Sequence, residues 1–143
     1  MTEATVPPRV VLDTNVLYAG LYSANGRSHR LLRAVTEGRV RIVLSTPLLF
    51  EYEDVLRRNR VVLGLGDTEI DTVLDNLCVL AEHQRIHFLW RPSLPDAKDD
   101  MVLELAVAAR VRSIVTFNAR DFGPAARFGI EVLSPKDLLE HLP

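Results

Sequence analysis

Five short apolar runs alternate with helical patterns along the chain, and this alternation constrains the fold more than any other feature. The runs are rich in Val, Ile and Leu and occupy residues 9–13, 41–44, 86–89, 113–116 and 130–133. Unbroken apolar runs of this length are typical of strands buried on both faces of a parallel sheet. We therefore predict an α/β fold of three layers, α/β/α, around a mostly parallel sheet of about five strands.

Helix-forming patterns fill the intervals between these runs. They cover residues 28–38, 46–58, 67–80 and 96–110, and a short last helix is opened by Ser134. Residues 61–67 contain two glycines and are predicted to form a linker, and residues 92–95 to form a loop between two prolines. Because no repeat or second compositional block is visible, we expect one domain over residues 1–143, with residues 1–8 as a flexible N-terminal tail.

The composition indicates a soluble globular protein. No apolar run approaches the roughly 20 residues that cross a bilayer, and residues 1–8 lack the basic start and apolar stretch of a secretory signal. We therefore expect a cytoplasmic protein without membrane contact. The single cysteine, Cys78, lies between apolar neighbours and is expected to fill the core rather than act as a nucleophile.

A net charge of −2 argues against a nucleic-acid partner, because such binding depends on Lys and Arg. The distribution of charge changes this expectation, since residues 1–60 carry nine arginines against six acids. Arg27, Arg30 and Arg33 recur at a spacing that places them along one side of a predicted helix. We predict that they form a phosphate-binding rim, with a solvated helix face as the alternative.

Polar side chains gather where the predicted strands end and where the helices beyond them begin. In an open parallel sheet, this edge holds the functional crevice. The residues concerned are Asp13, Glu51, Asp99, Asp100, Thr116, Asn118 and Asp121. Carboxylates that share a crevice raise one another's pKa unless a cation neutralises them, and Mg²⁺ and Mn²⁺ prefer such oxygen ligands. The four histidines are scattered and show no zinc-binding spacing.

Each of these acids also has a purely structural interpretation. Asp13, Thr14 and Asn15 are all residue types that cap a following helix. Asp96, Asp99 and Asp100 complement the dipole of the helix that they begin. Glu51 fits a solvated helix face. Asp13 is the hardest to explain in this way, because a buried strand that ends in a carboxylate places charge where ligands bind.

Four segments of the chain together resemble the PIN-domain family, in its toxin ribonuclease (VapC-like) branch from bacterial and archaeal toxin–antitoxin pairs. The segments are Val10–Val16, Leu48–Tyr52, the Asp99–Asp100 pair with Leu103 and Ala106, and Ile114–Phe122. The resemblance covers nearly the whole chain in order and spacing. Each motif alone is weak, whereas four in sequence are specific.

The resemblance implies that the chain is a Mg²⁺- or Mn²⁺-dependent endoribonuclease that hydrolyses RNA phosphodiesters. The implied catalytic and metal-binding acids are Asp13, Glu51 and Asp100, with Asp99, Thr14, Asn15, Thr116, Asn118 and Asp121 in support. Asn118 departs from the family pattern, because many members have a fourth Asp there, and Asp121 lies close to it. The resemblance also implies a small antitoxin partner, a homodimer and RNA as the ligand of Arg27, Arg30 and Arg33.

Two competing functions remain open. A phosphatase of the haloacid dehalogenase type also has an Asp after its first strand, but it needs a second Asp two residues later, where this chain has Asn15. It also needs a lysine, and the chain offers only Lys98 and Lys136. The other alternative is a PIN-like scaffold that binds RNA or an antitoxin without cutting, which Asn118 favours.

Overall fold

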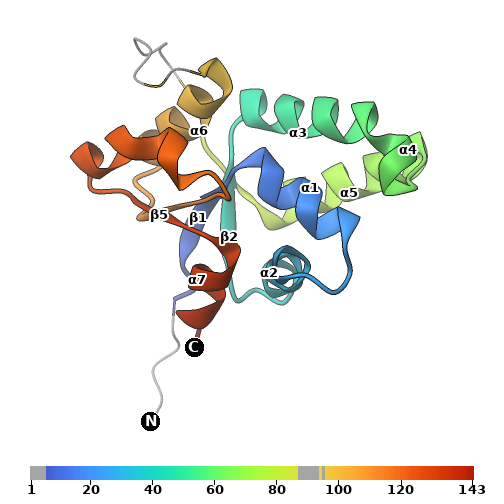
Figure 1. Ribbon diagram of the computed structural model, residues 1–143, viewed down its shortest axis with the longest axis horizontal. Coiled ribbons are helices and arrows are strands. Elements are labelled where there is room, and N and C mark those ends of the chain that lie inside the picture. Colours follow the sequence, from blue (N-terminus) through green and yellow to red (C-terminus); the bar gives the residue numbers. More distant parts are fainter. Residues whose placement is uncertain (1–5, 87–93, 95) are drawn as a thin grey trace.

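The computed structural model describes residues 6–86, 94 and 96–143 (Figure 1). Its strands form one five-stranded sheet in the order β3-β2-β1-β4-β5, and every neighbouring pair is parallel. The strands are β1 (Arg9–Leu12), β2 (Arg41–Leu44), β3 (Glu82–His83), β4 (Ser113–Val115) and β5 (Glu131–Leu133). The predicted α/β class and parallel sheet are confirmed.

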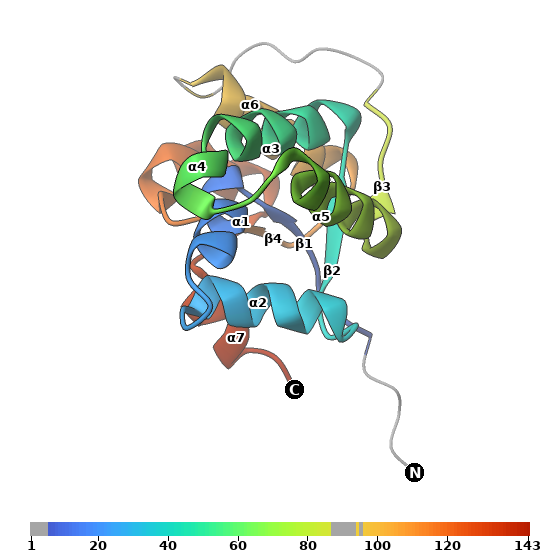
Figure 2. The same cartoon turned by 90° about the vertical axis from the view of Figure 1, so that its right-hand side faces the viewer.

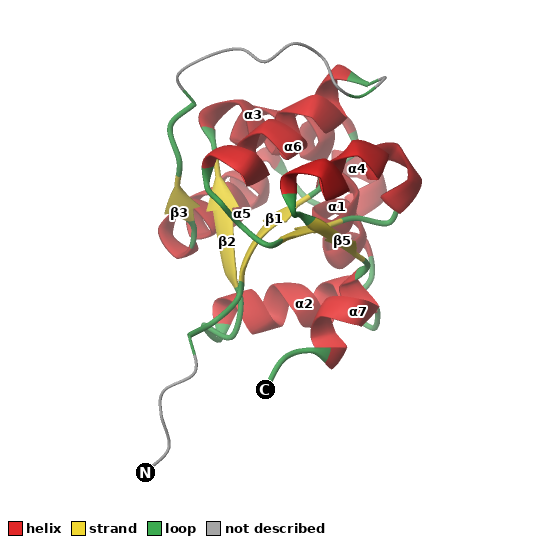
Figure 3. Cartoon of the chain, turned by 90° about the vertical axis from the view of Figure 1, so that its left-hand side faces the viewer, coloured by secondary structure: helices red, strands yellow, loops and turns green. Residues whose placement is uncertain are grey.

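Helices cover both faces of this sheet, which makes the three layers. They are α1 (Thr14–Tyr22), α2 (Arg27–Thr36), α3 (Thr46–Arg58), α4 (Arg60–Leu63), α5 (Asp67–Leu80), α6 (Ala97–Ala108), the 3₁₀ segment η1 (Ala119–Phe128) and α7 (Pro135–Glu140). Helix α6 contacts β1, β2 and β4, and Figure 1 shows it across the strands from α1 and α2. In Figure 2, α1, α2 and α5 lie in front of β1 and β2, and Figure 3 shows the sheet from the opposite side. No helix within the described ranges is long and apolar enough to span a membrane.

The core is built on the central strand β1 and its neighbour β2. Val10, Val11, Ile42 and Val43 are completely buried between the helical layers. Burying one such side chain stabilises the fold by about 1.5–3 kcal/mol, so these strands are held rigidly. The register of β1 and β4 pairs Leu12 with Val115, and the next residues of both strands emerge side by side at the carboxyl edge of the sheet.

The predicted linker over residues 61–67 is wrong in its first half, because α4 occupies Arg60–Leu63. Gly64 ends that short helix in the left-handed conformation, with φ of 69°. A glycine in this position is a helix C-cap, since it has no Cβ to oppose a positive φ. Leu63 and Leu65 pack against the core, which anchors the turn.

The third strand lies earlier than predicted. It is β3 at Glu82–His83, parallel to β2, whereas Ile86 belongs to no strand and residues 87–89 lie outside the described residues. A short edge strand has one neighbour and needs no apolar run, so its polar residues carried no strand signal. The predicted loop at 92–95 also lies outside the described residues, except for Leu94, which is buried.

Candidate active site

Asp13 follows β1 directly and lies at the centre of the carboxyl edge. Its side chain is held at both oxygens: Oδ1 accepts from the backbone N–H of Thr14 at 2.8 Å, and Oδ2 accepts from the Thr116 hydroxyl at 2.7 Å. Only 9% of the residue is exposed. Burial raises the pKa of Asp13, although these two hydrogen bonds oppose the shift, and the charges of Asp121 and Asp96 raise it further. Asp13 is therefore both the N-cap of α1 and a carboxylate held in an unfavourable environment.

The neighbours of Asp13 are fixed by the ends of the adjacent strands. The Thr116 hydroxyl, besides donating to Asp13, accepts from the backbone N–H of Asn118 at 3.0 Å. Beneath the site, the fully buried Tyr52 donates its hydroxyl proton to the carbonyl of Leu12. Burial and the nearby Asp13 charge both raise the pKa of Tyr52, so it stays a neutral donor. The predicted orienting role of Thr116 fits these contacts, whereas sequence reasoning missed Tyr52.

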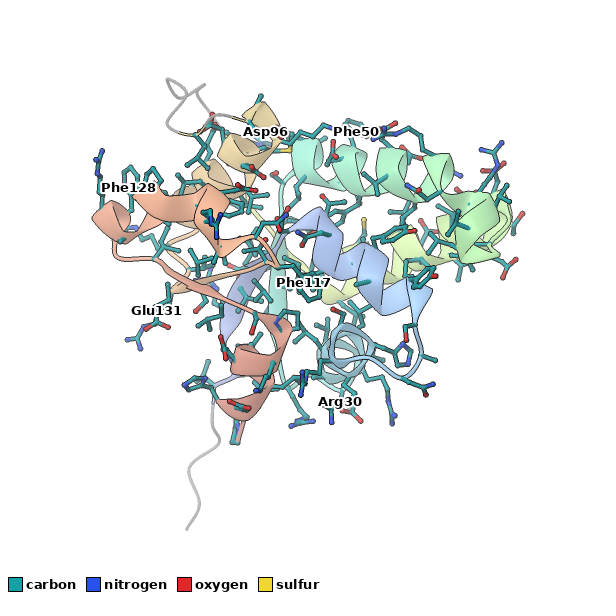
Figure 4. All side chains as sticks on the ribbon, viewed as in Figure 1. Arg30, Phe50, Asp96, Phe117, Phe128 and Glu131 are labelled. Carbon is teal, nitrogen blue, oxygen red and sulfur yellow. The ribbon has the colours of Figure 1, made fainter. Side chains whose placement is uncertain are left out.

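The first turn of α6 brings further carboxylates to the same place. The pKa of Asp99 is raised to about 6, first by burial and then by the charge of Asp13, with Asp96, Asp121 and Asp100 adding to it. Asp96 caps α6 by accepting from the backbone N–H of Lys98 at 2.8 Å, and Figure 4 shows Asp96 at the top of the molecule. One oxygen of Asp100 accepts from the backbone N–H of Leu94 at 2.9 Å. Asp96 and Asp99 therefore both interact electrostatically with Asp13.

Glu51, on α3, lies against the first turn of α6. Its side chain is 13% exposed, and Oε1 lies 3.5 Å from the ammonium of Lys98 on α6. Helices α3 and α6 contact each other, which accounts for this pairing of residues far apart in sequence. Sequence reasoning identified Glu51 but missed Lys98 as its partner, and it weighed Asp96 only as a helix-dipole residue.

The remaining predicted residues lie around this group. Thr14 is buried at the start of α1, and Asn15 on the same helix has a buried Oδ1 without a hydrogen-bond partner among the described residues. Asn118 and Asp121 are exposed, just before and within η1. Asp121 still raises the pKa of both Asp13 and Asp99, so the negative charge of η1 acts on the same carboxylates.

The three arginines predicted to bind RNA are all exposed on α2. Figure 4 shows Arg30 at the opposite end of the molecule from Asp96. Helix α2 leads into the beginning of β2, whereas the carboxylates follow strand ends. The RNA-guiding role of Arg27, Arg30 and Arg33 stays a prediction, and direct contact with a phosphodiester at the carboxylates is not what this position favours.

The donor set fits a hard divalent cation in an open site. In the ranges 6–86, 94 and 96–143, no three His, Cys, Asp or Glu side chains converge into a complete metal-binding group. Mg²⁺ does not require one, because it is usually held by one or two carboxylates, with waters and substrate phosphate oxygens as its other ligands. The described histidines, His29, His83 and His141, each contact a backbone carbonyl. Asp13 and Asp99 therefore fit an open magnesium or manganese site better than a closed zinc site.

Comparison with known proteins adds an independent observation. A protein-family model described as PIN domain matches residues 9–120, which is more than half of the chain. The matched region begins with β1 and includes α3, α6 and β4, the elements that position the carboxylates and Thr116. None of the curated proteins compared with the chain matches it.

Proposed function

The chain belongs to the PIN-domain family, whose members are generally nucleases that use divalent metal ions, and from this premise we propose that it is a Mg²⁺- or Mn²⁺-dependent endoribonuclease. The family membership favours a nuclease over the phosphatase alternative. The proposal includes three specific points: RNA is the substrate, cleavage is internal, and the ion is Mg²⁺ or Mn²⁺.

One observation supports the proposal most strongly: Asp13 is a buried carboxylate, and its charge raises the pKa of Asp99. Asp13 is buried, and its charge is the first electrostatic cause of the raised pKa of Asp99. Holding a carboxylate out of water beside other acids costs free energy unless a cation compensates it. A divalent cation would remove this repulsion, and binding of such an ion would therefore account for the grouping of these acids.

Each residue then has a defined task. When bound, the metal ion supplies an activated water and stabilises the charge that develops on the phosphate. Asp13, Glu51 and Asp100, the acids predicted from the sequence, would hold it, with Asp99 as an additional carboxylate. Thr14 and Thr116 hold Asp13 in one orientation by donating to its two oxygens. Asp121 adds negative charge from η1 and compensates for Asn118, which is neutral.

The biological setting is proposed on the sequence resemblance alone. In that setting the chain is the toxin of a toxin–antitoxin pair, is neutralised by a small antitoxin protein, forms a homodimer and acts in the cytoplasm. We expect a reading frame for an antitoxin beside the gene. We also expect that expression of the chain arrests growth and that co-expression of the antitoxin relieves the arrest. If expression of the active chain left growth unaffected, the toxin role would be contradicted, but the proposed ribonuclease activity would not.

A second candidate function is a scaffold that binds RNA or an antitoxin without cutting. It is favoured by Asn118 and by the absence of a three-residue metal-binding group among the described residues. The scaffold predicts RNA binding that is independent of metal ions and weak binding of Mn²⁺.

Cleavage of an internally structured RNA, labelled at either end, separates the two candidates. We expect internal cuts with Mg²⁺ or Mn²⁺, none in excess EDTA, and none with the Asp13→Asn variant under either condition. Cleavage that persists in EDTA would contradict metal dependence. Intact RNA with every metal ion, from a folded protein that binds it, would instead support the scaffold.

A further inference from the structure

Lys98 stands where helix electrostatics disfavour a cation. It is the second residue of α6, at the positive end of the helix dipole, and the acids of the same turn are Asp99 and Asp100. Its backbone N–H is held by the cap Asp96, which fixes where the side chain starts. The ammonium of this lysine instead meets a charged group on another helix.

That group is the carboxylate of Glu51. The ammonium and Glu51 Oε1 are 3.5 Å apart, a distance that makes an ion pair but is longer than a good hydrogen bond. The partners differ in burial: the Glu51 side chain is 13% exposed, and that of Lys98 is 55% exposed. Glu51 is therefore largely shielded from solvent, while the lysine reaches it from solvent and can leave without disturbing the core.

The presence of a lysine rather than an arginine at this position also indicates an ion pair that can be released. The chain contains seventeen basic residues, and only two of them are lysines, Lys98 and Lys136. Arginine holds a carboxylate with a planar, two-pronged set of donors, as Arg9 does with Glu82. A lysine ammonium is a point charge on a flexible stem, so it releases one oxygen anion and binds another at little cost.

We propose that Lys98 is an exchangeable counter-ion of Glu51: it neutralises Glu51 in the metal-free protein and turns to a phosphate oxygen of the RNA when a divalent cation takes the carboxylate. The second half of this inference rests on the proposed ribonuclease function, whereas the first half needs only the metal ion. Lys98 would then couple the two ligands, since metal binding frees the cation that binds the substrate.

Titration with Mn²⁺ in a calorimeter tests the first half. A half-exposed ion pair is worth about 0.2–1 kcal/mol, so Lys98→Gln should tighten Mn²⁺ binding by about 1.5- to 5-fold. Lys98→Arg should weaken it, because the guanidinium holds Glu51 more firmly. Lys136→Gln is the matched control: Lys136 is likewise the second residue of its helix, α7, which lies at the other end of the molecule from α6 in Figure 1.

The same titration in a Glu51→Gln background shows whether the effect passes through Glu51. There, Lys98→Gln should change Mn²⁺ affinity no more than Lys136→Gln does. If Lys98→Gln tightens Mn²⁺ binding equally with and without Glu51, the lysine acts only by long-range charge repulsion of the metal ion, and the proposal is wrong. Unchanged binding by both Lys98 variants would overturn it as well.

Binding of a fluorescent oligoribonucleotide with phosphorothioate linkages, checked for intactness on a gel, tests the second half. With Mn²⁺ present, Lys98→Gln should weaken binding and lower the salt slope by about 1, the loss of one phosphate contact. In EDTA it should have little effect, because Glu51 retains the ammonium. An equal loss in both conditions would rule out exchange. Failure of the parent protein to bind the oligonucleotide would refute the substrate and the exchange together, whereas the Mn²⁺ titration would still decide the pairing with Glu51.

Discussion

Thr116 and Asp13 are 103 positions apart in sequence, yet the threonine hydroxyl donates to Asp13 Oδ2 at 2.7 Å. The parallel register of β1 and β4 brings them together, because Leu12 and Val115 are paired and both side chains lie just beyond that pair. This hydrogen bond favours the charged form of Asp13, against the effect of burial. The contact therefore links the stability of the sheet edge to the charge of the candidate site.

We expect Thr116→Val to destabilise the protein by about 1–3 kcal/mol, because it leaves one oxygen of a buried carboxylate without a donor. Thr116→Ser keeps the hydroxyl and is the control. Urea denaturation at neutral pH in EDTA measures the difference between the two. Equal stability of the valine and serine variants would mean that the hydrogen bond contributes nothing to folding.

Asp13→Asn should leave the metal-free protein at least as stable as the parent. Asparagine is an equally good N-cap for α1, and the substitution removes a charge that burial and the neighbouring acids disfavour. Asp13→Ala loses the cap and should be less stable than Asp13→Asn by about 1 kcal/mol. Thermal unfolding in EDTA compares the three proteins. If asparagine were as destabilising as alanine, the charge of Asp13 would matter for folding rather than for binding.

Asp99 should make the metal-free protein less stable as the pH rises from about 4 to 6. Its pKa is raised from 3.8 to about 6 in the folded state, so in this range the folded chain keeps a proton that the unfolded chain has lost. Unfolding then releases a proton, and stability falls with rising pH, on the order of 1 kcal/mol after solvent screening is considered.

Denaturation curves across this pH range test the effect. Asp99→Asn should flatten the pH dependence and be more stable than the parent at pH 7 in EDTA. Saturating Mn²⁺ should remove the advantage of the variant, because the ion neutralises Asp99 in the parent. An unchanged pH profile in Asp99→Asn would assign the dependence to other carboxylates, with Asp13 as the first to examine.

Restoring a fourth acid should strengthen metal binding. Asn118 is neutral and exposed, and its backbone N–H donates to Thr116, so Asn118→Asp should lower the Mn²⁺ concentration needed for half-maximal cleavage. Asp121→Asn should raise it, because Asp121 contributes to the negative potential at Asp13 and Asp99. Calorimetric titration of both variants with Mn²⁺ separates binding from turnover. Affinities identical to the parent in both would show that residues 118–121 have no part in the metal site.

The sequence by itself determined the architecture, because periodicity and capping are local properties. The apolar runs at β1, β2, β4 and β5 fall within a residue of their predicted places, and Pro47 and Ser45 mark the start of α3 as expected. Asp13 was identifiable for the same reason: a charged residue that ends a buried strand is visible in the sequence alone. The short polar strand β3 and the single turn α4 were not, since neither has enough residues to show a period.

The tertiary structure decided which side chains meet. The order of acids along the chain does not say whether Asp99 or Asp100 faces Asp13, because neighbours on a helix point about 100° apart and only the docking of α6 on β1 and β4 chooses between them. In the folded chain the charge of Asp13 raises the pKa of Asp99, and one oxygen of Asp100 accepts from the backbone N–H of Leu94. The packing of α3 against α6 likewise gives Glu51 its partner Lys98. No local sequence pattern predicts this contact, because it depends on the distance between two helices rather than on the residues within either.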